Sequence, residues 1–303
     1  MKAGQNNRNQ RDEQMDELKI AAYAKINLSL DVLGRLPGGY HEMKMVMQTV
    51  SLCDDVLLAP AEDGLRRLET NFGFLPSDGR NIARRAAEAF FAAAGGGARG
   101  LSIRLEKRIP VGAGLGGGSA DAAAVLRGLN GLSGQPLPCG RMLEIAAGLG
   151  SDVPFCLLGG TRLASGRGEV LEELPSLPDC GVVICKPGFS IRTPDLFAKI
   201  DSRHSRIRPD TDGLVRAIRD GDLNGVARRM YNVFEDVLPQ GSGEVGVIKQ
   251  KLLSTGALGA VMSGTGSAVF GLFPDRAGAE AAAAALREDY RDCFAAVPVG
   301  NLL

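Results

Sequence analysis

The sequence contains no tryptophan and only two histidines, and aromatic residues make up 5% of its 303 positions. Its six cysteines are scattered, with no C-x-x-C pair among them. Zinc sites and disulfide frameworks depend on clustered cysteines and histidines, so this pattern argues against both and assigns no metal-ligating residue. We therefore expect a protein of the reducing cytoplasm.

Excess charge and long apolar runs are also missing. Lysine plus arginine and aspartate plus glutamate number 35 each, which gives no electrostatic reason to expect a nucleic acid or a membrane as partner. The N-terminus is polar, unlike a signal peptide, and no apolar run is long enough to cross a bilayer. Any nucleotide partner must therefore be held by local features of the chain.

The length and composition indicate two folded cores, since 45% of the 303 residues are hydrophobic. Residues 1–17 are polar with almost no apolar positions, so we expect a disordered tail. Pro175 and Pro178 indicate a linker between a first domain at 18–174 and a second at 180–303. Strands precede helices instead of alternating with them, which predicts a mixed α+β fold.

Hydrophobic periodicity places the individual elements. Apolar residues alternate over 18–33 as in a half-buried strand, with Lys25 on the opposite face. Turn residues at 34–39 predict a hairpin or a β-arch, Thr193-Pro194 begins a short helix, and a strand pair flanks 263–267. We expect strands at 18–33, 43–52, 56–58, 65–68, 101–105, 182–185 and 293–297, and helices at 81–94, 119–129, 141–149, 214–218, 223–238, 245–253 and 275–290.

The most informative stretch runs from Pro110 to Ala124. A strand at 101–105 leads into it and an alanine-rich amphipathic run from Ser119 to Leu129 leads out, which predicts strand, glycine turn and helix. Glycine permits positive φ and close approach of a ligand, while backbone amides and the helix dipole favour an anion. We therefore expect a nucleotide phosphate site. The five glycines are Gly112, Gly114, Gly116, Gly117 and Gly118.

Three other interpretations of this loop compete. A P-loop needs a lysine before a hydroxyl residue, and the chain has Ser119-Ala120 instead. The dinucleotide pattern G-x-G-x-x-G fits Gly112 to Gly117, but Pro110 interrupts the strand ahead of it and no acidic residue ends a second strand about 20 residues later. The plain structural alternative is a flexible turn or a set of helix-packing glycines.

Lys25 and Asp152 are the candidate catalytic pair. Asp152 lies between Gly150-Ser151 and Pro154, where an Asx-turn would be an ordinary structural explanation. Lys25 could equally lie on a solvated face of its strand. If both point into a cleft beside the glycine loop, Asp152 would accept a hydrogen bond from a substrate hydroxyl. Lys25, the loop amides and Mg²⁺ would then stabilise the charge of a γ-phosphate.

Three further features carry open alternatives. Ser119 could be only an N-cap, or it could also bind phosphate or metal, since the two roles are compatible. The segment 263–267, Ser-Gly-Thr-Gly-Ser, is either a plain hairpin turn or a nest of amides for another phosphate. Phe197 is either a core residue or, with Tyr40, a stacking surface for a base at the mouth of a cleft.

Seven motifs follow one another along the chain: Lys25-Ile-Asn-Leu28, Gly39-Tyr-His41, the glycine loop, Gly150-Ser-Asp-Val-Pro-Phe155, Gly159-Gly-Thr161, Gly166-Arg-Gly-Glu169 and Met262-Ser-Gly-Thr-Gly-Ser267. With them, the chain from about residue 18 to its end resembles the GHMP kinase superfamily. The first, second and fourth motifs are similar to those of the superfamily branch that acts on a cytidine-diphosphate-linked methylerythritol. This resemblance implies two α+β domains with the active site in the interdomain cleft. It also implies ATP-dependent phosphorylation of the substrate 2-hydroxyl, giving the 2-phosphate and ADP, in the non-mevalonate isoprenoid pathway.

The resemblance also implies roles for individual residues. Tyr40 and Phe197 would sandwich the cytosine, and His41 would read its edge. The catalytic residues would be Lys25 and Asp152. The substrate would be bound by Asn27, Tyr40, His41, Asp152, Thr193, Phe197, Gly264 and Thr265. ATP would be surrounded by Asn81, Pro110, Val111, Gly112, Ala113, Gly114, Leu115, Gly116, Gly117, Gly118, Ser119 and Ala120. Members often carry Ser-Ser-Asp where this chain has Ser-Ala-Asp at 119–121, which excludes a metal role for position 120.

Three other functions fit the sequence less well. A kinase for mevalonate or homoserine would share the loop but has no need for Tyr40, His41 and Phe197 at a cytosine. A dinucleotide-binding oxidoreductase needs the acidic ribose partner that is missing. A non-catalytic nucleotide-binding protein has no need for Lys25 and Asp152. We expect ATP and Mg²⁺ as cofactors and a monomer or homodimer.

Overall fold

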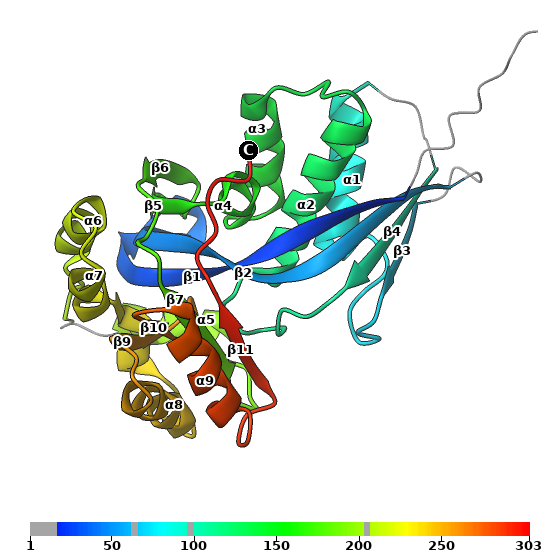
Figure 1. The fold of residues 1–303 in the computed structure, drawn as a ribbon. Helices are drawn as coiled ribbons and strands as arrows, with labels where there is room; N and C mark the ends of the chain where they lie inside the picture. Colours follow the sequence, from blue (N-terminus) through cyan, green and yellow to red (C-terminus); the bar gives the residue numbers. More distant parts are fainter. Residues whose placement is uncertain (1–16, 62–65, 96–99, 203–206) are drawn as a thin grey trace, which may run out of the picture.

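The computed structural model describes residues 17–61, 66–95, 100–202 and 207–303, which form two β-sheets with helices packed on them (Figure 1). Apart from Glu17, the tail expected over residues 1–17 lies outside the described residues. Strands and helices mix without a βαβ series, so the α+β prediction is confirmed. The division into domains at 18–174 and 180–303 stays a prediction.

The first sheet is built on a long antiparallel pair, β1 (Leu18–Arg35) and β2 (His41–Ala61). Its order is β3-β4-β2-β1-β8, and β5 pairs with both β2 and β6. The other strands are β3 (Arg66–Thr70), β4 (Gly100–Glu106), β5 (Thr161–Ser165), β6 (Val170–Leu174) and β8 (Tyr231–Asn232). The helices of this part are α1 (Ile82–Ala93), α2 (Gly117–Leu132), α3 (Cys139–Leu149) and α4 (Val153–Leu158). Helix α2 packs on β1 and β2, between α1 and α4.

The second sheet is antiparallel, in the order β11-β7-β10-β9. Its strands are β7 (Gly181–Lys186), β9 (Gly259–Met262), β10 (Val269–Phe273) and β11 (Asp292–Ala296). Helix α8 (Gly243–Ser254) packs on β9 and β10, and α9 (Arg276–Leu286) packs on β7 and β11. The remaining helices are α5 (Thr193–Ser202), α6 (Thr211–Arg219) and α7 (Leu223–Arg229). No helix within the described ranges is long and apolar enough to cross a membrane.

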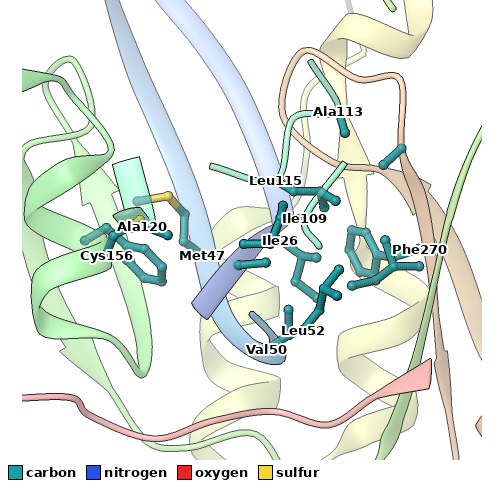
Figure 2. Close-up of a cluster of buried hydrophobic side chains, with 14 of the residues drawn as sticks. Ile26, Met47, Val50, Leu52, Ile109, Ala113, Leu115, Ala120, Cys156 and Phe270 are labelled. Atoms are coloured by element: carbon teal, nitrogen blue, oxygen red, sulfur yellow. The ribbon is translucent and has the colours of Figure 1, made fainter. Parts of the chain in front are cut away.

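Alternation in β1 predicts one buried face, yet both faces are buried from Ala24 to Val32. Figure 2 shows Ile26 in one apolar cluster with Leu115 of the glycine loop and Phe270 of β10, so the glycine loop and the second sheet cover the face that carries Ile26. Lys25 and Asn27 alternate with Ile26 and lie on the opposite face, where both are also buried. These polar residues are therefore held inside the molecule.

The helix expected over 223–238 is wrong. Helix α7 ends at Arg229, and β8 follows it beside β1. The Asn232 side chain holds this break, because its amide donates to the carbonyl oxygens of Met262 at 2.8 Å and Gly264 at 2.7 Å. Long-range hydrogen bonds thus outweigh the apolar periodicity of the segment.

Other element boundaries also differ from the sequence expectations. Helix α2 begins at Gly117, two residues before the expected start at Ser119. The strand expected at 56–58 is not separate, because β2 continues to Ala61 along the full length of β1. The tight turn expected at Asp152 leads directly into α4, a helix that the sequence analysis did not anticipate.

Candidate active site

Apolar residues between the glycines anchor the glycine loop, which is residues 110–116. Ala113 and Leu115 are buried in the core, while Gly112, Gly114 and Gly116 adopt φ of 65°, 76° and 70°. These φ values strain any residue with a Cβ, which is why glycine alternates with the buried anchors. The backbone N–H of Lys25 donates to the carbonyl of Leu115 at 3.0 Å and ties the loop to β1.

The glycine loop leads directly into α2. Gly116 is the N-cap of this helix and makes no side-chain capping bond, and Ser119 is the third helical residue. The N-cap interpretation of Ser119 is therefore wrong. Its partly exposed hydroxyl instead lines the cavities described below.

The segment 263–267 is the loop of the β9–β10 hairpin, and it packs against the glycine loop. The Ser263 hydroxyl donates to the carbonyl of Gly114 at 3.0 Å, and the Ala268 N–H donates to that of Ala113 at 3.1 Å. The hairpin interpretation is confirmed, and a phosphate-binding nest there stays a prediction. The two glycine-rich loops therefore form one continuous surface.

Lys25 and Asp152 lie next to each other beside this surface. Lys25 Nζ is 3.5 Å from Asp152 Oδ2 and donates to Asn27 Oδ1 at 2.7 Å. Lys25 is only 4% exposed, so the solvated-face interpretation is wrong. Asp152 stands at the N-cap position of α4 but makes no side-chain capping bond, which leaves its partly exposed carboxylate directed to other partners.

Two cavities meet at the glycine loop. A cavity of about 780 Å³, here called the acceptor cavity, is lined by Lys25, Asn27 and Asp152. A second of about 450 Å³, the nucleotide cavity, is lined by Asn81 and Lys107 and by the glycine loop. The residues common to both are Gly114, Gly116, Ser119, Thr193 and Thr265. A phosphate held on the loop would therefore face both cavities.

The far end of the acceptor cavity is aromatic. Tyr40 is 53% exposed, with the Arg167 guanidinium 4.7 Å from its ring centroid. The His41 ring stacks on Phe197, with centroids 4.4 Å apart. The implied sandwich of a cytosine between Tyr40 and Phe197 stays a prediction, and in this structure one face of Phe197 is occupied by His41. Gly264 also lines this cavity.

Three charged residues of the acceptor cavity, Arg35, Arg167 and Asp201, were missed by the sequence analysis. Arg167 lies in the motif Gly166-Arg-Gly-Glu169, where its position between two glycines was a usable signal. Asp201 lies on α5 in an ordinary helical sequence, and nothing local marks it. Its place in the cavity depends on how α5 packs, which one sequence does not reveal.

The nucleotide cavity contains most of the residues expected around ATP. Every residue from 110 to 119 lines it, whereas Ala120 is buried and lies beside Cys156 and Met47 in Figure 2. Asn81 also lines it, and this side chain caps α1 by accepting from the Ala83 N–H at 2.9 Å. Its amide donates to the carbonyl of Pro76 at 2.8 Å. Asn81 therefore shapes the cavity wall as well as lining it.

A buried ion cluster supports the two ends of the glycine loop. Lys107, just before the loop, donates to Asp54 and, at 2.5 Å, to Asp121 of α2. Asp54 also accepts the backbone N–H groups of Arg108 and Ile109. Burial opposes the charge of Lys107, but the two carboxylates outweigh it and raise the pKa of this lysine. The cluster fixes the entry and exit of the loop relative to β2.

One lysine cannot neutralise both carboxylates of this cluster. Asp54 accepts three hydrogen bonds, whereas Asp121 Oδ1 is buried with no partner among the described residues. Burial, reinforced by the neighbouring Asp54 carboxylate, raises the pKa of Asp121 to about 7 although Lys107 opposes the shift. Asp121 is thus the member that takes up a proton as pH falls.

The raised pKa of Asp121 predicts a pH-dependent stability change. A carboxyl group whose pKa is higher in the folded than in the unfolded state stabilises the fold fully below its unfolded pKa of about 4. This stabilisation is lost as the pH rises through the folded pKa of about 7. Asp121→Asn mimics the protonated form and does not titrate. We expect the melting temperature of Asp121→Asn minus that of the parent protein to be larger at pH 8 than at pH 5. A difference that is equal at both pH values would contradict this, and Asp289→Asn, at an exposed carboxylate, is the control.

No group of three or more histidine, cysteine, aspartate and glutamate side chains is placed to hold a metal within the described ranges. Two oxygen ligands of the kind that Mg²⁺ takes, the Ser119 hydroxyl and the Asp152 carboxylate, do line the acceptor cavity beside the loop. Mg²⁺ is commonly held by one or two carboxylates together with substrate phosphates. The donor set therefore fits a metal that arrives with a nucleotide.

Comparison with known proteins places the chain in a family. Family models described as GHMP kinases N terminal domain and GHMP kinases C terminal match residues 81–160 and 214–292. A crystal structure of 4-(cytidine 5'-diphospho)-2C-methyl-D-erythritol kinase is similar with a TM-score of 0.78 and 34% identity, covering 93% of this chain and 100% of that one. A homoserine kinase from Cytophaga hutchinsonii is similar with a TM-score of 0.73 and 23% identity, covering 94% and 95%, which shows the shared fold alone.

Sequence relatives narrow the family further. The chain is 41% identical over 268 residues to the 4-diphosphocytidyl-2-C-methyl-D-erythritol kinase of Alkaliphilus metalliredigens, and 46% identical over 266 residues to that of Pelotomaculum thermopropionicum. Each alignment covers 88% of this chain and 92% of the relative. The chain has the GHMP kinase fold and belongs to the 4-diphosphocytidyl-2-C-methyl-D-erythritol kinase family.

Proposed function

We propose that this chain transfers the γ-phosphoryl group of ATP to the 2-hydroxyl of 4-diphosphocytidyl-2-C-methyl-D-erythritol, giving the 2-phosphate and ADP. The observation that carries the proposal is the meeting of two cavities at the glycine loop, with Lys25 and Asp152 on the acceptor side. Such an arrangement suits transfer from a nucleotide in one cavity to an alcohol in the other. The named substrate of the family's relatives supplies the identity of that alcohol.

In this proposal the chain works mainly by positioning. The glycine-loop amides and the start of α2 hold the ATP phosphates, since backbone N–H groups and the helix dipole both favour anions. The Asp152 carboxylate accepts a hydrogen bond from the substrate hydroxyl and receives its proton as the new P–O bond forms and the bond to ADP breaks. Lys25, held by Asn27, stabilises the negative charge on the transferring group.

Ser119 and Asp152 are the residues that would hold Mg²⁺ with the nucleotide. When bound, the ion would neutralise charge on the β- and γ-phosphates. We further propose, from the scattered cysteines, that the enzyme is cytoplasmic. We also propose that it is a monomer or homodimer.

The direct test is ATP consumption by purified protein with Mg²⁺ and 4-diphosphocytidyl-2-C-methyl-D-erythritol, run beside mevalonate and homoserine. Turnover with the cytidine compound alone supports the proposal and the aromatic end of the cavity as its determinant. Turnover with mevalonate or homoserine instead would keep the phosphate site but discard the cytosine site. No turnover with any of them would overturn the proposal in favour of a non-catalytic nucleotide-binding protein.

Tyr40 provides a separate prediction about substrate affinity. Stacking of a base on an aromatic ring contributes about 1–3 kcal/mol, so Tyr40→Ala is expected to raise KM for the cytidine substrate roughly 5- to 150-fold. The value of kcat should change little, because the ring lies far from the reacting atoms in this proposal. Phe74→Ala, which removes an exposed aromatic ring that does not line the acceptor cavity, is the control. An unchanged KM in Tyr40→Ala would make that ring structural.

A further inference from the structure

Three charged or polar side chains form a chain of hydrogen bonds at the aromatic end of the acceptor cavity. Arg35, at the end of β1, donates to Asp201 Oδ2 at 2.5 Å, and Asp201 Oδ1 lies 2.9 Å from Nε2 of His41. All three line the acceptor cavity. None of them has a part in the phosphoryl transfer proposed above, so their arrangement calls for a separate explanation.

Helix α5 holds the His41 ring from two directions. Phe197 and Asp201 are four residues apart on this helix, so their side chains share one face. Phe197 stacks on the imidazole with an interplanar angle of 24°, and Asp201 bonds its Nε2. The ring plane and one of its two nitrogens are therefore both fixed by the same helix.

The chemistry of Asp201 fixes which nitrogen of His41 carries a proton. The hydrogen bond from Arg35 lowers the pKa of Asp201, and a carboxylate can only accept hydrogen bonds. Nε2 of His41 must then be the N–H that donates to it. In a neutral imidazole the other nitrogen, Nδ1, is left as an acceptor. Within the described residues Nδ1 makes no hydrogen bond to the protein, so it is available to a ligand in the cavity.

We infer that Asp201 is a positioning residue that fixes the tautomer of His41, so that Nδ1 accepts a hydrogen bond from the exocyclic amino group of the substrate base. This inference rests on the proposed function and adds a basis for selecting the base. Cytosine presents an amino donor at its C4 position, whereas uracil presents a carbonyl acceptor there. An acceptor at Nδ1 pairs with the amino group of cytosine and repels the carbonyl oxygen of uracil. The opposite tautomer of His41 would reverse this preference.

The first experiment reads the tautomer directly and needs no substrate. The chain has only two histidines, so a long-range ¹H–¹⁵N spectrum of the imidazole nitrogens, assigned with His204→Gln, isolates His41. In the neutral ring of His41 we expect a protonated Nε2 and an unprotonated Nδ1. A protonated Nδ1 in the parent protein would overturn the inference whatever the activity of the enzyme.

The second experiment measures base selection with CDP and UDP as probes, by titration calorimetry. We expect the parent protein to prefer CDP and Asp201→Asn, whose amide can either accept from or donate to Nε2, to lose about tenfold of that preference. Asp201→Glu keeps the carboxylate and should retain most of the preference. Asp195→Asn, on the same helix but bonded to Arg192 rather than His41, is the matched control.

The outcomes separate this inference from the proposed function. A CDP preference in the parent protein that survives Asp201→Asn would overturn the role of Asp201 while leaving the kinase proposal intact. A parent protein that binds neither nucleotide and has no kinase turnover would overturn both. Equal losses of CDP and UDP binding in Asp201→Asn would indicate general damage to the cavity and would also reject a role in base selection.

Discussion

Asp152→Ala is expected to lower kcat by at least ~10²-fold, the range for a positioned acid–base group, with little change in KM for the alcohol substrate. The carboxylate makes no bond that holds α4 together, so its removal should leave the fold unaltered. Its partner Lys25 would remain, buried and bonded to Asn27. The loss should therefore appear in the chemical step, as measured by steady-state kinetics with each substrate varied in turn.

The neighbouring Ser151 provides the control for this experiment. It also lines the acceptor cavity but is exposed and has no assigned part in the reaction. Ser151→Ala should remain within a few-fold of the parent enzyme. If Asp152→Ala behaves in the same way, Asp152 has no place in the mechanism, and the positioning of the hydroxyl would have to come from other groups.

Gly114→Ala is expected to damage both stability and nucleotide affinity. A Cβ on Gly114 would lie 2.0 Å from the carbonyl oxygen of Ser263 and 3.0 Å from the N–H of Gly266, both backbone atoms. The φ of 76° at this residue adds about 1–2 kcal/mol of strain for alanine. Overpacking usually costs about 1–3 kcal/mol. The two glycine-rich loops must move apart, so we expect at least about 2 kcal/mol less stability.

The same displacement should raise KM for ATP at least about tenfold, because the loop amides no longer converge on the phosphates. Denaturant unfolding and steady-state kinetics measure the two effects. Gly131→Ala, near the end of α2, is the matched control because its Cβ would meet nothing within 4 Å. That change should stabilise the helix by about 0.5–1 kcal/mol. Parent-like stability and ATP affinity in Gly114→Ala would contradict the packing of the two loops.

The features that the sequence predicts well are those in which a local pattern has one physical meaning. The glycines of 112–118 indicate a turn with positive φ between a strand and a helix, and the structure has positive φ at Gly112, Gly114 and Gly116 ahead of α2. For Lys25 the sequence left an interior and a solvated position open, and the structure buries it. Asp201 and Asp121 carried no such signal, because their surroundings are assembled from segments far apart in the chain.

The break after Arg229 illustrates the same limit for secondary structure. The residues of 223–238 have helical periodicity, and a single side chain, Asn232, diverts them by bonding to backbone carbonyls more than 25 residues away. Propensity describes what a segment prefers alone, whereas these bonds exist only after the second sheet has formed. One sequence does not contain the information that places the two segments together.

The route of the final segment restricts how the active site opens. After β11 the chain leaves the second sheet and returns along the first, where Val299 bonds Thr49 and Leu302 bonds Leu158 (Figure 1). The chain also crosses between the sheets from β6 to β7, from β7 into β8 beside β1, and from β8 back to β9. These connections, together with the hydrogen bonds between the two glycine-rich loops, oppose a wide separation of the sheets. Substrate entry and product release are therefore expected to depend on the loops around the cavities rather than on a wide parting of the sheets.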